Sequence, residues 1–277
     1  MGTIVFVHAH PDDEASSTGG AAARASDEGH RVVVVTCTDG DFGNRPDDLA
    51  DGETLVARRR AETARSVEIL GVHRHVWLGY ADSGMHGWAE NTADNAFCSA
   101  PIDEAAERLA AVLLEERADV VVVYDWHGGY GHPDHVQVHR VGHRAAALAG
   151  VPRVLETTFN RDAWIRSAEQ FRDMNPDAAD DFDPNQPGDD GNLIGTSEAE
   201  IHLAVDLAPW AGRKQAALAA HASQVDDAVA MASMPPDLFA QMFGTEWYIE
   251  PGTPGPMRWG WIFETTEVDA ATQTAGT

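Results

Sequence analysis

The sequence predicts an α/β protein with a Rossmann-like fold, a mostly parallel sheet with helices on both faces. Short runs rich in Val, Ile, Thr and aromatic residues alternate with longer segments rich in Ala, Leu, Glu and Arg. This alternation is typical of parallel strands joined by right-handed helical crossovers. No G-x-G-x-x-G sequence follows the first apolar run, so we do not expect a nicotinamide cofactor.

The predicted elements follow one another in a regular order, β-α-β-α-β-α-β-α-β. The segments with the length and composition of strands are residues 3–9, 31–38, 75–80, 119–124 and 153–159. The segments between them that are long enough for helices are residues 16–29, 53–70, 103–117 and 135–149. In such a sheet the carboxyl ends of the parallel strands lie along one edge, where ligands bind.

The length and composition predict one domain. The chain has 277 residues, 43% of them hydrophobic, which is enough for one large core. We expect this domain to cover residues 1–265, with a mobile acidic loop at about residues 174–192 and a disordered tail at residues 266–277. The region after Gln224 is expected to form an edge element or a lid near the mouth of the site.

Charge and hydropathy exclude several classes of partner. The net charge of −26 argues against binding to nucleic acid or to an anionic membrane, because either would repel the protein. No apolar run approaches the roughly 20 residues of a membrane span, and no signal peptide is recognisable, so we expect a cytoplasmic protein. The two cysteines, Cys37 and Cys98, do not form a CxxC pair and are expected to be free thiols.

The motif His-Pro-Asp occurs twice, each time shortly after a predicted strand. Residues 9–14 read AHPDDE and residues 131–135 read GHPDH. Pro11 and Pro133 suit the first turn of a helix. In a doubly wound sheet whose strand order reverses beside the first strand, the first and fourth strands are neighbours. The two motifs should therefore meet at one edge of the sheet.

Together the motifs supply the residue types of a metal site. Their side chains are His10, Asp12, Asp13, Glu14, His132, Asp134 and His135. Two histidines and one aspartate suit a catalytic zinc with an open position, and Fe²⁺ fits such a set as well. A carboxylate that is not a ligand remains available as a general base. The nearby His8 and His139 are expected to pack around the ligands rather than to bind the metal.

AHPDDE and GHPDH resemble the two signatures of the LmbE/PIG-L family of zinc-dependent N-deacetylases. This family includes deacetylases and amidases of mycothiol metabolism and the de-N-acetylase of N-acetylglucosaminyl phosphatidylinositol. The resemblance spans about residues 3–225. It extends to TDGDFG at residues 38–43, RRAETARSVEILGV at 59–72, WLGYADSGM at 77–85 and KQAALAAHASQ at 214–224.

The resemblance implies a role for each motif residue. The implied zinc ligands are His10, Asp13 and His135. Asp12 would act as general base toward a zinc-activated water. His132 would stabilise the oxyanion or protonate the leaving amine, oriented by Asp134. These roles suit amide hydrolysis, which needs a strong nucleophile, a polarised carbonyl and a proton for the departing nitrogen.

Further residues are implied to contact the substrate. Tyr130 matches a tyrosine that assists at the carbonyl, and Arg59 and Asp82 match positions that contact the sugar. Arg59 also fits a solvated helix face, and Asp82 also fits a turn cap. Asp41, another candidate substrate contact, departs from the family, which often has Glu there. His221 lies near the site in the family pattern, and a structural hydrogen bond suits it equally.

The implied function is a metal-dependent hydrolase that removes an N-acyl group, chiefly acetyl, from a small molecule containing an amino sugar. Three alternatives remain: an amidase acting on mycothiol-type thiol conjugates, an ester or phosphate hydrolase, and a non-catalytic metal or carbohydrate-binding protein. The intact Asp12 and His132 count against the last of these, because a binding protein needs neither a base nor a proton donor. The substrate, the acyl group, the metal and the oligomeric state do not follow from the sequence.

Overall fold

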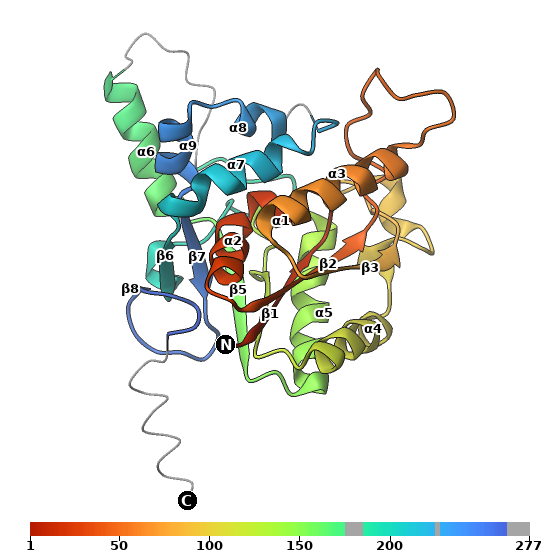
Figure 1. The fold of residues 1–277 in the computed structure, drawn as a ribbon, viewed down its shortest axis with the longest axis horizontal. Coiled ribbons are helices and arrows are strands. Elements are labelled where there is room, and N and C mark those ends of the chain that lie inside the picture. Colours follow the sequence, from red (N-terminus) through yellow and green to blue (C-terminus); the bar gives the residue numbers. More distant parts are fainter. Residues whose placement is uncertain (175–184, 225–227, 265–277) are drawn as a thin grey trace, which may run out of the picture.

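A computed structural model describes residues 1–174, 185–224 and 228–264 (Figure 1). Its centre is an eight-stranded sheet in the order β3-β2-β1-β4-β5-β7-β6-β8. The strands are β1 (Thr3–His8), β2 (Arg31–Thr38), β3 (Arg74–Tyr80), β4 (Val120–Tyr124), β5 (Arg153–Thr158), β6 (Leu203–Asp206), β7 (Thr245–Ile249) and β8 (Arg258–Trp259). The first five are those predicted, and they pair in parallel. The α/β fold class is confirmed.

Helices cover both faces of the sheet, as predicted. The α-helices are α1 (Asp13–Ser16), α2 (Gly19–Asp27), α3 (Leu55–Leu70), α4 (Ile102–Glu116), α5 (Pro133–Ala149), α6 (Arg161–Met174), α7 (Ala211–Ala219), α8 (Ala230–Ala232) and α9 (Pro236–Phe243). Helices α2, α7 and α9 lie on one face of the sheet, and α4 and α5 lie on the other (Figure 1). The predicted helix at residues 16–29 is two elements, because α1 ends at Ser16 and α2 begins at Gly19.

The central strands are buried on both faces because their alternate residues enter different cores. Ile4 and Phe6 of β1 face α2 and α7, whereas Val5 and Val7 face α4 and α5. All four side chains are at most 1% exposed. A strand buried in this way has a continuous apolar sequence, which explains why β1, β2 and β4 are readable from the sequence.

The sequence after Gln224 supplies both an edge strand and an interior strand. β8 is the last strand of the sheet, so the expected edge element is present, whereas β7 lies inside the sheet between β5 and β6. β7 is antiparallel to both neighbours. Its alternate residues Glu246 and Tyr248 are buried, so a charged residue occupies a core position and hides the strand pattern.

Several sequence predictions concern segments at the limits of the described residues. Residues 175–184 of the expected acidic loop, and the tail at residues 266–277, lie outside them. The division into one domain with a mobile loop and a disordered tail therefore stays a prediction.

Cys37 and Cys98 are free thiols, as predicted. Among the described residues, no helix is both long and apolar enough to cross a membrane.

A buried ion pair joins β7 to the helix layer. The Lys214 ammonium on α7 lies 2.9 Å from Glu246 Oε1, and both side chains are 3% exposed. The Glu246 carboxylate also accepts hydrogen bonds from the backbone N–H groups of Gly20 and Ala21, at the start of α2, and from the Tyr248 hydroxyl. One carboxylate thus links α7, β7 and the amino end of α2.

We predict that Lys214→Met lowers the free energy of unfolding by about 3 kcal/mol, because the Glu246 charge stays buried without its cation. Urea unfolding followed by circular dichroism measures this change. The matched control is Arg65→Ala, which breaks the exposed Arg65–Glu68 pair and should cost less than about 1 kcal/mol. Equal losses in the two variants would contradict the assigned role of Lys214.

Candidate active site

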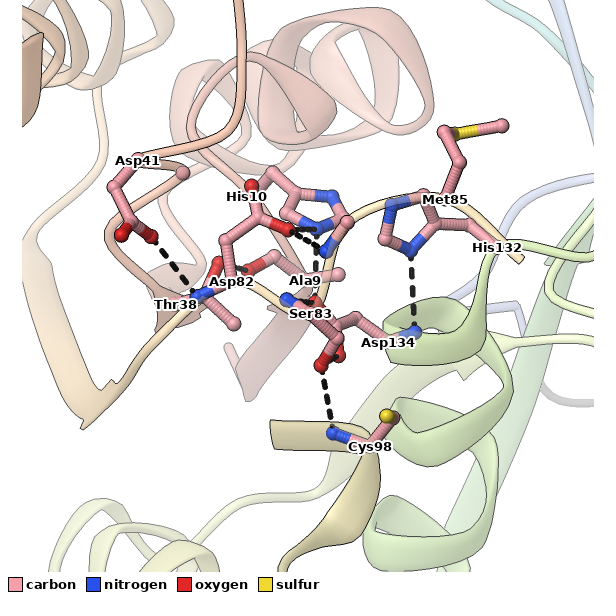
Figure 2. A network of polar contacts seen from close by, with 12 residues as sticks. Ala9, His10, Thr38, Asp41, Asp82, Ser83, Met85, Cys98, His132 and Asp134 are labelled. Carbon is pink, nitrogen blue, oxygen red and sulfur yellow. Dashed lines mark hydrogen bonds and ion pairs between the residues drawn. The ribbon is translucent and has the colours of Figure 1, made fainter. Parts of the chain in front are cut away.

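The two His-Pro-Asp motifs meet at the carboxyl edge of the sheet. β1 pairs with β4 in parallel over Ile4 to Phe6, so the segments that follow these strands lie side by side. α1 begins at Asp13 and α5 begins at Pro133, directly within the motifs. The predicted adjacency is confirmed. The turn after β3 supplies a third segment, which carries Asp82 and Ser83 (Figure 2).

Three side chains form a small triangle of potential metal ligands. His10 Nδ1 lies 3.4 Å from Asp13 Oδ2, and His135 Nε2 lies 3.4 Å from the same oxygen. The two nitrogens are 3.3 Å apart. All three residues are buried. Burial opposes ionisation of Asp13, but His135 and His10 outweigh it and hold the pKa of Asp13 well below its usual range.

These separations fit a tetrahedral metal ion. Ligand atoms bound tetrahedrally at about 2.0–2.1 Å from zinc are about 3.3–3.4 Å from one another. His10, His132 and His135 also bring ligand atoms within 4.8 Å of one another, so a three-histidine set is an alternative. The triangle with Asp13 fits more closely, because each of its edges has the tetrahedral length.

The second nitrogen of His10 faces two carboxylates. His10 Nε2 lies 3.2 Å from Asp134 Oδ2 and 3.5 Å from Asp82 Oδ1. Asp134 is fixed in turn by the backbone N–H of Ser83, at 2.9 Å, and by the Ser83 hydroxyl. A carboxylate behind a ligating imidazole fixes the tautomer and orientation of the ring. Asp134 therefore holds His10 so that Nδ1 faces the triangle.

His132 is oriented differently from the prediction. The Asp134 carboxylate binds Ser83 and His10, and it is the backbone N–H of Asp134 that donates to His132 Nδ1, at 3.1 Å (Figure 2). Burial, together with the nearby His10 and His135, lowers the pKa of His132 to about 2. The ring is therefore neutral, with Nδ1 as acceptor and Nε2–H as donor.

Asp12 lies beside the triangle and is not part of it. It has a left-handed backbone conformation, with φ of 97°, which is rare for a residue other than glycine. Its Oδ2 lies 3.1 Å from the Arg59 guanidinium. Burial raises the pKa of Asp12 to about 6, although the charge of Arg59 opposes this shift. The carboxyl is suited to take up and release a proton near neutral pH.

Arg59 is buried rather than solvated. It is 3% exposed, and it also donates to the backbone carbonyls of Gly40 and Pro11. A sugar contact of Arg59 stays a prediction. The run Arg58-Arg59-Arg60 gave no sign of which arginine faces inward.

The remaining predicted substrate residues line the same region. Tyr130 is half-buried, with its ring 5.0 Å from that of His135. Asp82 is buried, whereas Asp41 is exposed and its carboxylate accepts a hydrogen bond from the Asp82 N–H at 3.2 Å (Figure 2). Burial opposes ionisation of Asp82, but His10 outweighs it and lowers the pKa of Asp82. Their contacts with substrate stay predictions.

Neighbouring histidines have structural partners. His221 Nε2 lies 2.7 Å from Glu14 Oε1, and both side chains are fully buried. Glu14 also accepts a hydrogen bond from the backbone N–H of Asp12. His8 lies between Tyr124 and Thr18. The sequence did not indicate that the Tyr124 ring stacks on His135, with ring centroids 4.1 Å apart.

The fold and the site together are those of an α/β protein with a buried cluster of histidines and carboxylates that could hold a metal ion. Residues 5–146 match the model of the PIG-L family, which is described as GlcNAc-PI de-N-acetylase. A relative from Saccharomonospora viridis, named 1D-myo-inositol 2-acetamido-2-deoxy-alpha-D-glucopyranoside deacetylase, is 39% identical over 86% of this chain and 88% of its own length. The chain belongs to the PIG-L family, and it is a deacetylase.

Two solved structures share the fold at low sequence identity. The N,N'-diacetylchitobiose deacetylase of Pyrococcus horikoshii is 22% identical, with a TM-score of 0.57 over 90% of this chain and 83% of that chain. The 4-carboxy-2-hydroxymuconate hydratase of Pseudomonas putida is 18% identical, with a TM-score of 0.57 over 94% and 100%. Because one neighbour is a hydratase, the fold alone does not specify the reaction.

We predict that Asp134→Asn weakens zinc affinity by about 10–100-fold, because His10 loses the carboxylate that orients it. Competition with a chromophoric chelator measures the dissociation constant. The control is Asp41→Asn, which removes an exposed carboxylate near the same site and should leave zinc affinity unchanged. Wild-type affinity in Asp134→Asn would show that this carboxylate does not support the ligand.

Proposed function

We propose that the protein removes the N-acetyl group from an N-acetylglucosamine linked to a small polar alcohol, and that its metal is Zn²⁺. The substrate class follows the name of the relative from Saccharomonospora viridis, which is similar over most of both chains. The observation that carries the proposal is the triangle of His10, Asp13 and His135, with the unligated carboxylate of Asp12 beside it. This arrangement provides an ion site and a separate base.

The chemistry divides between the ion and three side chains. When bound, Zn²⁺ polarises the amide carbonyl and acidifies water. Asp12 accepts the proton of the attacking water, and its pKa of about 6 allows the carboxyl to release that proton again. The same proton then passes to the amide nitrogen as the C–N bond breaks. The products are acetate and the free amino sugar.

His132 is proposed to stabilise the oxyanion. Its neutral ring accepts a hydrogen bond at Nδ1 and therefore donates through Nε2. Such a donor, aligned with the developing negative charge on the former carbonyl oxygen, contributes about 3 kcal/mol. The low pKa of His132 favours this role over that of a proton donor, because a neutral imidazole is a poor acid. Tyr130, on the same loop, is proposed to assist at the carbonyl.

The test is primary-amine release from a panel of N-acetylglucosamine glycosides, including the inositol glycoside, and mycothiol-like thiol conjugates. Protein loaded with Zn²⁺ and protein loaded with Fe²⁺ are compared. We expect kcat/KM to be highest for the inositol glycoside, and higher in the protein loaded with Zn²⁺ than in the protein loaded with Fe²⁺. Preference for a thiol conjugate would replace the proposed substrate, and higher activity with Fe²⁺ would replace the proposed metal.

We predict that Asp12→Asn lowers kcat by about 10²–10⁴-fold, because the site loses its general base. The variant should bind zinc at the site of His10, Asp13 and His135 with nearly unchanged affinity, since Asp12 is not one of these three ligands. Fluorescamine detection of amine release and chelator competition measure the two quantities. Loss of zinc together with activity would mean that Asp12 is a ligand instead.

We predict that kcat/KM falls about tenfold per pH unit below about pH 6, because Asp12 has to be ionised to accept a proton. Arg59→Gln should move this acidic limb to higher pH, since Arg59 lowers the pKa of Asp12. The matched control is Arg60→Gln, because the Arg60 side chain is 49% exposed and is not among the causes of the Asp12 pKa shift. This control should leave the acidic limb in place. If the limb stays in place in Arg59→Gln, Asp12 is not the titrating base.

A further inference from the structure

A second group of metal-ligating side chains lies further along α5, beyond the two motifs. His139 and His143 are four residues apart and therefore share one face of this helix. Glu156, on β5, faces them. Each residue offers one nitrogen or oxygen, and these atoms lie within 4.8 Å of one another. None of the three belongs to the site described above.

The carboxylate of Glu156 is buried between the two imidazoles. Its Oε1 lies 2.7 Å from His143 Nε2 and 3.6 Å from His139 Nδ1, and its side chain is 8% exposed. Across the described residues it forms no ion pair with an arginine or lysine. The histidine side chains are 22% and 32% exposed, so the cluster is accessible from solvent. Among the described residues, the ion-pair partners of the buried Glu156 carboxylate are thus the imidazoles of His139 and His143.

The donor set suits a divalent transition metal. Imidazole and carboxylate ligands favour Zn²⁺, Cu²⁺ and Ni²⁺ over Mg²⁺ and Ca²⁺. The distances of 2.7 and 3.6 Å lie on either side of the about 3.3 Å edge of a tetrahedral zinc site, so small side-chain shifts would form it. Binding through His139 Nδ1 would replace its 3.1 Å hydrogen bond to the Tyr124 carbonyl.

The state of His139 also favours an ion. Burial lowers the pKa of His139, although Glu156 opposes this shift. Its ring is therefore neutral near pH 7. The single ring proton lies on Nδ1, which donates to the Tyr124 carbonyl, and this proton would move to Nε2 when Nδ1 binds the ion. An ion held there would tie α5 to β5 beside Tyr124, whose ring stacks on His135.

We propose that His139, His143 and Glu156 form a second site for a divalent transition metal such as Zn²⁺, separate from the site of His10, Asp13 and His135. The inference does not rest on the proposed substrate, because its test counts ions rather than turnover.

The test is the number of zinc ions per chain after equilibrium dialysis against Zn²⁺ at neutral pH, measured by mass spectrometry of the metal. Two ions are expected in the wild-type chain. His143→Gln and Glu156→Gln should each reduce the number to one, and His135→Ala should retain the ion of the second site. His73→Gln, which removes an exposed histidine outside both clusters, is the control and should retain both ions.

Two outcomes overturn the proposal. One is a single ion in the wild-type chain that is lost in His135→Ala. The other is two ions that persist in both His143→Gln and Glu156→Gln. Circular dichroism and the ion retained in the first site show that each variant is folded, so a lost ion reports the second site itself.

Discussion

The parallel pairing of β1 with β4 is the constraint on which the site depends. It places two segments more than 100 residues apart in the chain at one edge of the sheet. His10 and Asp13 follow β1, and His135 follows β4, so the triangle of ligand atoms exists only while the two strands keep their register. That register is maintained by side chains such as Phe6 and Val122, which are at most 1% exposed. Core packing thus fixes a geometry in which ångström differences decide whether an ion fits.

The site keeps several carboxylates away from water, which is costly unless each has a partner. Asp13 is paired with two imidazoles, Asp134 with Ser83 and His10, and Glu14 with His221. Asp12 has the least complete compensation: Arg59 lies beside it, yet its pKa rises to about 6. The uncompensated part of this desolvation would make Asp12 a usable base near neutral pH, as the proposed mechanism requires, whereas Asp13 stays ionised, as its proposed role as a metal ligand requires.

The sequence predicted the five parallel strands, β1 to β5, and most plainly those that are uniformly apolar. β1, β2 and β4 are Val-rich runs with no competing pattern, but β7 carries Glu246 at a buried position and β6 has only four residues. The motifs predicted which side chains meet, and the family resemblance suggested their roles. The family resemblance placed Arg59 at the site, but the sequence contained no signal for its contact with the Pro11 carbonyl or for the Ser83–Asp134 contact, because both arise from tertiary packing between distant segments.

The hydrogen bond from the Asp134 backbone N–H to His132 Nδ1 bears on how protons move in the reaction. A doubly protonated His132 would place its own Nδ1–H against this donor, so the first turn of α5 itself disfavours the imidazolium. His132 is then left with a single N–H, suited to hold an oxyanion and unsuited to deliver a proton. The leaving nitrogen still needs a proton, and Asp12 is the neighbouring group whose pKa, about 6, is near neutrality. In the proposed mechanism one carboxyl would therefore serve both proton transfers, and the chain holds this carboxyl on a residue with a left-handed backbone conformation that costs free energy.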